Sequence, residues 1–483
     1  MNPTENKKNL WKEVDADEYQ VHVTISTIDS TTELSEEADD KIVYMEDLEK
    51  RKQIYGICGE CNEPGTGEDW CQPCNAKRFK DNFKNWTSGN KHIDEFIQQS
   101  QLNAVYYSKK LEWIPFENFN DIIYIARGGF GKVYSAEWPE GYIYSWDIEN
   151  QKWNRYGDMK VALKSLDNSS CLSTEFLNEI KTHLQIYLLD VIQCYGITQD
   201  PNTKDYMMVL RYCKNGNFRN YYMNNESNYY SKIGELRQIV SGLLDIHSAG
   251  KIHKDFHSGN ILYYDNRIPF ISDLGMCQPA NNEKQSAKQE GIYGVLPYMA
   301  PEVLRGYQYT KASDIYSFGI MMNEYISEET PYNNIPHDHA LAIKICKGLR
   351  PNIFKYTPKL FANLITKCWN AKAENRPTAK ELYQIFYKWD NYEYDDSDIK
   401  SIKSQISEYD DKIVLNRTIE KKSKNIQTHP QAIYTSRLLS FKNLPEPVNS
   451  GAIQSTLFSE GFDCQLDELD LNEINQDDEN NIE

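Results

Sequence analysis

The stretch that decides the fold reads KIHKDFHSGNILYYDNRIPFISDLGM and spans residues 251–276. Two apolar runs, residues 261–264 and 268–271, flank an Asp-Asn pair, which predicts two strands joined by a turn. Such a hairpin would bring Asn260 and Asp273, the residues at its two ends, to one place. Amide and carboxylate oxygens are ligands that suit Mg²⁺. The sequence therefore predicts that two oxygen-bearing side chains meet at the open end of this hairpin.

A lysine and a glutamate upstream of this stretch are placed to form a pair. Lys164 ends the run VALK, which reads as a buried strand. Glu179 follows within EFLNEIKTH, residues 175–183, which reads as a helix. Taken singly, each could be a solvated charge. Paired, the glutamate would fix the geometry of the lysine.

Further motifs complete an ordered series. The segment ARGGFGKV, residues 126–133, precedes the lysine, and APE (300–302), SDIYSFG (313–319) and NRP (375–377) follow the hairpin. In this order the motifs resemble a eukaryotic protein kinase, most closely the tyrosine-kinase-like group expanded in some fungi. The resemblance covers about residues 116–390. It implies an α+β, two-lobed fold with a small antiparallel β-rich lobe that carries one helix and a large α-helical lobe.

The resemblance implies transfer of the ATP γ-phosphoryl group to protein substrates, with Mg²⁺ held by Asn260 and Asp273. Such transfer depends on positioning and on charge stabilisation. Asp255 would be the catalytic base, and Lys164, held by Glu179, would bind the α- and β-phosphates. The other predicted nucleotide contacts come from the glycine-rich loop, the strands beside it, the hinge and the floor of the cleft: Ala126, Arg127, Gly128, Gly129, Phe130, Gly131, Val133, Ala162, Leu210, Tyr212 and Leu262.

Three further residues have structural roles in the resembled family. Glu302 and Arg376 would form a buried ion pair. Asp314 would orient the backbone of the catalytic loop, and it reads equally as the N-cap of a helix.

Several positions depart from the family pattern. Ala126 replaces a glycine, which predicts weaker or slower ATP binding. Lys254 replaces an arginine that would grip an activation-loop phosphate, so regulation by loop phosphorylation is in doubt. That loop offers only Ser286 and Tyr293 as plausible acceptors. Val295 stands where serine/threonine kinases have a threonine.

Two function classes stay open. The first is an active protein kinase, favoured by the retained lysine, glutamate, aspartates and asparagine, and acting on Ser or Thr more than on Tyr. Tyr298 supports that preference, because tyrosine kinases favour a tryptophan there. His257 stands where serine/threonine kinases carry a lysine that touches the γ-phosphate, and it could replace that lysine in part. The second class is a pseudokinase, a nucleotide-binding scaffold that acts by recruiting partners.

Four of the eleven cysteines are clustered as two C-x2-C pairs. The spacing of Cys58, Cys61, Cys71 and Cys74 predicts a tetrahedral thiolate site for structural Zn²⁺, with two disulfides as the rival interpretation. The charged residues between Cys58 and Cys74 are all acidic, so RNA is not the expected ligand. A protein partner or a purely structural role is left open. Because the module lies far in sequence from the catalytic residues, we expect it to be dispensable for phosphoryl transfer.

Composition places the chain in a broad class. The net charge of −18 over 483 residues argues against nucleic-acid and anionic-membrane partners. No run of about 18 apolar residues and no apolar leader is present, so neither a membrane span nor a signal peptide is expected. Seven scattered single cysteines favour a reducing compartment. We expect a cytoplasmic protein, with access to the nucleus not excluded.

The chain divides into five expected segments. Residues 1–53 are polar and acid-rich and are expected to be disordered, as is the tail 391–483, whose acidic end is a possible partner site. Residues 54–80 form the four-cysteine module, 81–115 a helical linker and 116–390 the kinase domain. An aromatic-rich insertion at 142–156 predicts a hairpin whose side chains either pack internally or form a docking surface.

Overall fold

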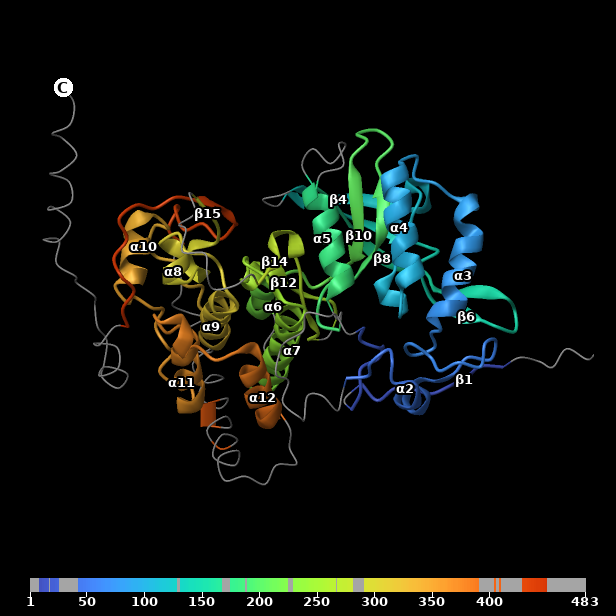
Figure 1. The fold of residues 1–483 in the computed structure, drawn as a ribbon. Coiled ribbons are helices and arrows are strands. Elements are labelled where there is room, and N and C mark those ends of the chain that lie inside the picture. Colours follow the sequence, from blue (N-terminus) through green and yellow to red (C-terminus); the bar gives the residue numbers. More distant parts are fainter. Residues whose placement is uncertain are drawn as a thin grey trace, which may run out of the picture.

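The computed structural model describes most of the chain (Figure 1). The described residues are 8–16, 18–25, 42–127, 131–166, 174–186, 189–224, 229–265, 267–280, 291–390, 404, 408–409 and 428–449. Within them, no helix is both long and apolar enough to cross a membrane.

The small lobe is built on a six-stranded sheet. Its strand order is β3-β9-β10-β8-β5-β4, parallel between β3 and β9 and antiparallel elsewhere. The strands are β3 (Glu112–Trp113), β4 (Asn120–Arg127), β5 (Gly131–Trp138), β8 (Met159–Leu166), β9 (Cys194–Gln199) and β10 (Tyr206–Arg211). Along β8, Val161 and Leu163 are fully buried while Lys164 between Leu163 and Ser165 faces the other side. This period of two is what aims the lysine away from the sheet core.

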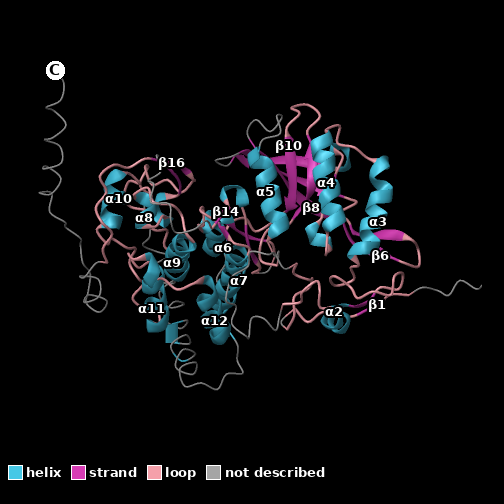
Figure 2. Cartoon of the chain, in the orientation of Figure 1, coloured by secondary structure: helices cyan, strands magenta, loops and turns pink. Residues whose placement is uncertain are grey.

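Two helices lie against the sheet. They are α4 (Lys91–Asn103) and α5 (Thr174–Gln185) (Figures 1 and 2). Ile93 and Ile97 of α4 share one buried cluster with Phe176 and Ile180 of α5. The predicted linker at 81–115 is therefore part of the small lobe, because α4 packs on it and β3 extends its sheet.

The four-cysteine module adjoins this lobe. It contains β1 (Leu10–Trp11), α2 (Leu48–Tyr55), β2 (Gly56–Ile57), α3 (Gln72–Asn82) and the short 3₁₀ turns at Phe83–Asn85 and Tyr107–Lys109. The expectation of disorder over 1–53 is wrong for the described residues there. Val23 and Val43 are buried against Ile54 and Tyr55, so a few apolar residues anchor a segment that is polar on average.

The aromatic insertion forms the predicted hairpin, β6 (Tyr142–Asp147) paired with β7 (Lys152–Tyr156). Several of its rings pack against other elements, whereas Tyr144 and Tyr156 are exposed. Trp153 stacks on Phe79 of α3 at a ring-centroid distance of 4.7 Å, and Tyr142 stacks on Tyr195 of β9 at 4.8 Å. The hairpin therefore bridges the cysteine module and the small-lobe sheet.

The large lobe is helical. Its helices are α6 (Phe218–Asn224), α7 (Tyr229–Ser248), α8 (Pro301–Leu304), α9 (Lys311–Ser327), α10 (His339–Cys346), α11 (Lys359–Cys368) and α12 (Ala379–Asp390), with 3₁₀ turns at Ser258–Asn260, Leu274–Met276, Leu296–Tyr298 and Ala373–Asn375, whereas the turn at Phe116–Asn118 belongs to the small lobe. α9 is buried along almost its whole length and forms the centre of the lobe. Two small strand pairs, β11 (Lys251–Ile252) with β14 (Gln278–Pro279) and β12 (Ile261–Tyr263) with β13 (Pro269–Ile271), lie where the lobe faces the sheet.

The tail departs most from expectation. Residues 428–449 run along the outside of α8 and α10, and β16 (Arg437–Leu439) pairs with β15 (Ile292–Gly294) (Figure 1). The prediction of a disordered tail from residue 391 is wrong for this stretch. Its mean polarity hides buried positions such as Leu439, which joins the large-lobe core.

Candidate active site

Lys164 lies at the centre of a three-residue charge cluster between the lobes. Its Nζ is 2.7 Å from Oε1 of Glu179 on α5 and 2.8 Å from Oδ1 of Asp273. Burial would lower the pKa of Lys164, but the two carboxylates outweigh burial and raise the pKa above its ordinary value. The lysine is therefore charged, and it is held in place from two sides.

The loop that carries Asp255 is held by hydrogen bonds to its backbone. Asp314 of α9 accepts from the N–H groups of His253 (2.8 Å) and Lys254 (3.0 Å). Of the two roles predicted for Asp314, only the first is found, because the N-cap of α9 is Thr310 in a capping box with Ser313. Lys254 adopts a positive φ of 71°, a conformation that this double anchor stabilises.

Asn260 and Asp273 are brought together by the predicted hairpin. β12 and β13 pair with Ile261 opposite Ile271, and the backbone N–H of Ser272 donates to the carbonyl of Asn260 at 2.8 Å. The Asn260 amide nitrogen donates to the Asp255 carbonyl at 2.9 Å. That bond leaves the amide oxygen as the atom able to bind a metal. Two hard oxygen donors at one end of a hairpin fit Mg²⁺.

The ring of His257 is fixed by the loop itself. Its Nδ1 accepts from the N–H of Gly259 at 3.0 Å, so the proton of the neutral ring is on Nε2. Nε2 lies 3.7 Å from Oδ2 of Asp255. A Cβ on Gly259 would lie 2.6 Å from the ring, which explains the glycine. His257 thus presents a hydrogen-bond donor, not a base, beside Asp255.

The predicted nucleotide contacts fall on the strands around Lys164. Ala126 and Arg127 end β4, opposite Val133 and Lys132 of β5, and Gly128, Gly129 and Phe130 lie outside the described residues. Val133 pairs with Lys164 itself. Gly131 is required by close approach, because a Cβ there would lie 1.8 Å from the Ser165 carbonyl oxygen.

The remaining predicted contacts lie deeper or at the hinge. Ala162 of β8 is opposite Leu210 of β10, and both are half-buried. Tyr212 follows β10, with Nζ of Lys160 at 5.2 Å from its ring centroid. Leu262 is half-buried on β12 and forms a bridge with Asn217. The described nucleotide contacts predicted from the sequence thus lie on β4, β5, β8, β10 and β12 and on the segment that follows β10.

Two contacts hold the described ends of the activation segment. Lys254 donates to Oε1 of Gln278 at 3.1 Å, and its Nζ lies 5.1 Å from the Tyr309 ring centroid. Val295 is buried. Ser286 lies outside the described residues. The segment ends at Glu302, which forms a two-bond ion pair with Arg376 (2.6 and 2.8 Å).

Reasoning from sequence missed Ser436, which lies at the site. The hydroxyl of Ser436 donates to Oδ2 of Asp255 at 2.5 Å and lies 3.4 Å from Nε2 of His257. Burial alone would raise the pKa of Asp255, but His257 and this hydroxyl outweigh burial and lower the pKa to about 2. The available signal was the run IYTSRLLSF at 433–441, which is strand-like within a polar tail.

Arg219, which reasoning from sequence also missed, links the catalytic loop to the segment that follows Gly294. Arg219 of α6 donates to the hydroxyls of Ser258 (3.0 Å) and Tyr298 (2.8 Å) and to Glu324 of α9 (3.0 Å). Tyr298 donates to the other oxygen of Glu324 at 2.5 Å. This network fixes the catalytic loop against the segment that follows Gly294.

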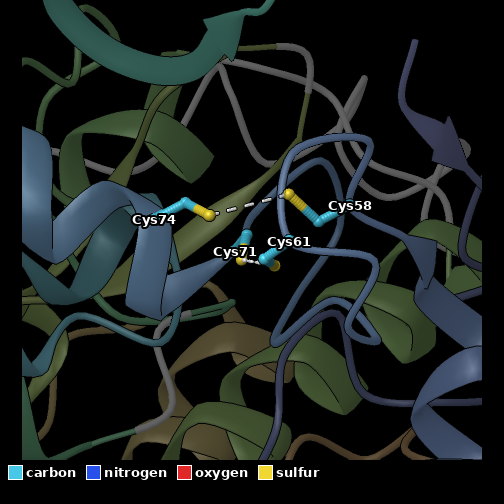
Figure 3. Close-up of side chains that lie close together, drawn as sticks. All are labelled: Cys58, Cys61, Cys71 and Cys74. Atoms are coloured by element: carbon cyan, nitrogen blue, oxygen red, sulfur yellow. Dashed lines mark hydrogen bonds between the residues drawn. The ribbon is translucent and has the colours of Figure 1, made fainter. Parts of the chain in front are cut away.

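The four clustered cysteines converge as predicted from their spacing (Figure 3). All four sulfurs lie within 4.8 Å of one another, with Cys58 3.9 Å from Cys74 and Cys61 3.6 Å from Cys71. None of the described cysteines forms a disulfide, so the rival interpretation is not supported. Four thiolates about 2.3 Å from one Zn²⁺ would place their sulfurs about 3.8 Å apart, so the cluster fits the metal.

Fold and site together define a two-lobed domain with a sheet lobe, a helical lobe and a cluster of charged groups between them. The chain belongs to the protein tyrosine and serine/threonine kinase family, whose model matches residues 122–386. That family binds ATP and Mg²⁺. The fungal subgroup suggested by the motifs stays a prediction.

Several kinases are similar to this chain. Tyrosine-protein kinase SPK-1 of Girardia tigrina is 25% identical over 54% of this chain and 51% of its own length. A probable LIM domain-containing serine/threonine-protein kinase of Dictyostelium discoideum is 28% identical over 56% and 39%. Human receptor-interacting serine/threonine-protein kinase 1 is 30% identical over 51% and 38%. The match thus spans about half or less of the length of these relatives.

Proposed function

We propose that the chain is an active protein kinase that transfers the γ-phosphoryl group of ATP to Ser and Thr hydroxyls of proteins. The observation that carries the proposal is the charge cluster of Lys164, Glu179 and Asp273. Asp255 is joined to the same hairpin by the hydrogen bond from the Asn260 amide. Lys164 would hold the α- and β-phosphates, and Mg²⁺ on Asn260 and Asp273 would offset the phosphate charge. Asp255 would accept the proton of the attacking hydroxyl.

A preference for Ser and Thr is supported by the depth of the acceptor position. Ser436 reaches Asp255 with its short side chain while its neighbours form a strand with β15. A tyrosine on the same backbone would carry its hydroxyl several ångströms past the carboxylate. The retained Lys164, Glu179, Asp255, Asn260 and Asp273 support an active kinase over the pseudokinase alternative.

Two further features belong to the proposal. Zn²⁺ on Cys58, Cys61, Cys71 and Cys74 would hold the module together, and the outer face of that module or the acidic tail would receive a protein partner. The described cysteines carry no disulfide, which supports a reducing compartment such as the cytoplasm.

The test is phosphoryl transfer from radiolabelled ATP with Mg²⁺ to a generic basic protein substrate, for the wild type and for Asp255→Asn. We expect a loss of about a thousandfold or more in the variant. Phosphoamino-acid analysis should give phosphoserine and phosphothreonine. Activity of Asp255→Asn within tenfold of the wild type would remove Asp255 as the base, and a predominance of phosphotyrosine would reverse the acceptor preference.

A further inference from the structure

A segment of the tail occupies the place where an acceptor must bind. Residues 428–449, here named the docked segment, are held at both ends and in the middle. At the first end, the N–H of His429 donates to the Asn333 carbonyl at 2.8 Å, and the Tyr434 hydroxyl donates to the Pro331 carbonyl at 2.7 Å. The guanidinium of Arg219 lies 4.3 Å from the Tyr434 ring centroid. The segment thus touches the network that fixes the catalytic loop.

The middle of the docked segment forms a strand with the activation segment. β16 pairs antiparallel to β15, with Tyr293 opposite Leu438 and Gly294 opposite Arg437. Arg437 donates to the His337 carbonyl at 2.6 Å, and Leu439 is buried in the large-lobe core. The backbone pairing and the buried Leu439 side chain together determine which residue of the segment lies opposite which residue of β15.

The far end is fixed by side-chain and backbone contacts. Glu446 forms a two-bond ion pair with Arg305, and the N–H of Val448 donates to the Cys346 carbonyl at 3.0 Å. The Asn449 amide oxygen accepts from the N–H of Ala371 at 2.8 Å. The docked segment therefore contacts the large lobe along its whole length, from residue 429 to residue 449. A non-specific surface contact would not involve so many directed hydrogen bonds.

This register places one hydroxyl on the base. Ser436 is half-buried with its Oγ 2.5 Å from Asp255, while Thr435 and Ser440 on either side are exposed. Neighbouring residues of an extended chain face opposite sides, so Thr435 cannot share the position of Ser436. We propose that Ser436 is a phosphorylation site that this chain modifies on itself, within one molecule. The inference rests on the proposed kinase function.

The step balances with ATP as the only co-reactant. Oγ of Ser436 attacks the γ-phosphorus of ATP, and the new O–P bond replaces the bond from that phosphorus to the bridging oxygen. ADP leaves with the electron pair of the broken bond. The Ser436 proton passes to the Asp255 carboxylate, which is 2.5 Å away and releases it later to solvent.

The modification would undo the docking that produces it. A phosphoserine carries a charge of about −2 at neutral pH. At position 436 that charge would lie against the Asp255 carboxylate, where like charges repel. The docked segment therefore excludes other substrates until Ser436 is phosphorylated, and release then opens the site.

The experiment incubates the purified full-length chain with Mg²⁺ and ATP and follows the tryptic peptide of residues 425–437 by mass spectrometry. That peptide carries Thr428, Tyr434, Thr435 and Ser436, and fragmentation assigns the phosphate to one of them. We expect phosphate on Ser436, formed with a rate constant that stays the same over a hundredfold dilution of the protein. Asp255→Asn should give none.

Several outcomes would overturn the inference. Phosphate on Thr435 in place of Ser436, or a rate constant that rises with protein concentration, would contradict the docked register. A basic protein substrate in the same tube separates the two proposals. If it is phosphorylated and Ser436 is not, this inference alone fails, and if neither is phosphorylated, the kinase function fails with it.

Matched variants test the docking. Ser440→Ala, in the same segment but exposed, should leave the phosphorylation of Ser436 within twofold of the wild type. Leu439→Asp should release the segment, lowering KM for the basic substrate about tenfold and slowing Ser436 modification. Glu446→Gln breaks the ion pair to Arg305 without a buried charge and should give the same change to a smaller extent. An unchanged KM in both variants would show that the segment does not occupy the acceptor site.

Discussion

Lys164 holds two carboxylates, so replacing it has two separable consequences. Lys164→Met should lower phosphoryl transfer about a thousandfold, because the positive charge for the α- and β-phosphates is lost. It also leaves Glu179, whose side chain is 2% exposed, without its cation, so we expect a lower Tm as well. Transfer assays and thermal unfolding measure the two effects.

The matched control for this change lies on the same strand. Lys160→Met removes a lysine whose side chain is 39% exposed and whose ion pair to Glu137 is long, at 3.7 Å. It should keep activity within twofold and Tm within about 1 °C, since exposed pairs contribute little. Equal losses in both variants would mean that Lys164 has no special role.

His257 offers a second test with two variants. His257→Asn keeps an acceptor for the Gly259 N–H but removes the Nε2 donor, whereas His257→Ala removes both. We expect the Asn variant to keep the Tm and to lose about tenfold in kcat, as for a general electrostatic contact in the transition state. The Ala variant should have both a lower Tm and a lower kcat. Wild-type kcat in His257→Asn would leave His257 with a capping role only.

Among single residues, the sequence predicted the groups whose spacing is local. Asn260 and Asp273 come together because two apolar runs and a turn between them form a hairpin. Ser436 could not be predicted in the same way. Its position depends on Leu439 joining the large-lobe core and on Glu446 pairing with Arg305, just after α8. These contacts join segments far apart in the chain and leave no period in the sequence.

At the scale of elements, α4 supports the helix that carries Glu179. Ile97 of α4 is fully buried in the cluster that also holds Phe176 and Ile180 of α5. Lys109, just after α4, donates to the carbonyls of Leu184 and Ile186 at the end of α5. The expectation that the module upstream of residue 110 is dispensable is therefore at odds with these contacts.

Ile97→Asp tests this support. A buried carboxylate costs about 3 kcal/mol or more. We expect a lower Tm and at least a tenfold loss of kcat, because α5 positions Glu179. Gln99→Asp, exposed on the same helix, is the control and should match the wild type. Full activity of a chain cut at residue 110 would contradict the role given to α4.

His183 on α5 should contribute to the pH dependence of the free energy of unfolding. Its Nδ1 lies 2.8 Å from the Ile192 carbonyl, and its Nε2 has no hydrogen-bond partner among the described residues. Burial, with the charge of Lys164 in support, lowers the pKa of His183 to about 4. The unfolded chain binds this proton below about pH 6.5 and the folded chain does not, so stability is lost as pH falls from 6.5 toward 4.

The measurement is the slope of unfolding free energy against pH. His183→Gln should flatten it between pH 4 and 6.5 by up to about 1.4 kcal/mol per pH unit, the effect of one proton. Glutamine keeps a donor for the Ile192 carbonyl. An unaltered slope in His183→Gln would show that His183 titrates normally in the fold.

At the scale of the whole molecule, the cysteine module and the catalytic lobes are one assembly. Trp70 stacks on Trp153 of the β6–β7 hairpin at 6.1 Å, and the Arg78 guanidinium lies 4.2 Å from the Trp146 ring centroid. The hairpin in turn is tied to β3, because Arg155 pairs with Glu112 at 2.8 Å. Sequence analysis predicted the hairpin but not its contacts with the cysteine module and with β3. These contacts join three segments that are separate in the sequence, so no local pattern indicates them.

Metal removal should therefore be felt beyond the module. We expect one Zn²⁺ per chain by metal analysis, and removal by a chelator should lower both Tm and kcat. Cys71→Ser should lose the metal, whereas Cys213→Ser, outside the cluster, should keep it. Zinc content equal in the two variants would exclude the four-cysteine site.

Ser436 is hydrogen-bonded to Asp255 of the same polypeptide chain, and this tethering has a consequence for which outside substrates can react. A tethered group acts at an effective concentration on the order of millimolar, whatever the amount of protein present. A free protein encountered at far lower concentration cannot displace the docked segment by its acceptor residue alone. Substrates would need a second attachment point elsewhere on the molecule. Until Ser436 is phosphorylated, the docked segment would thereby restrict which proteins can be phosphorylated. This restriction would not depend on the concentration of the protein.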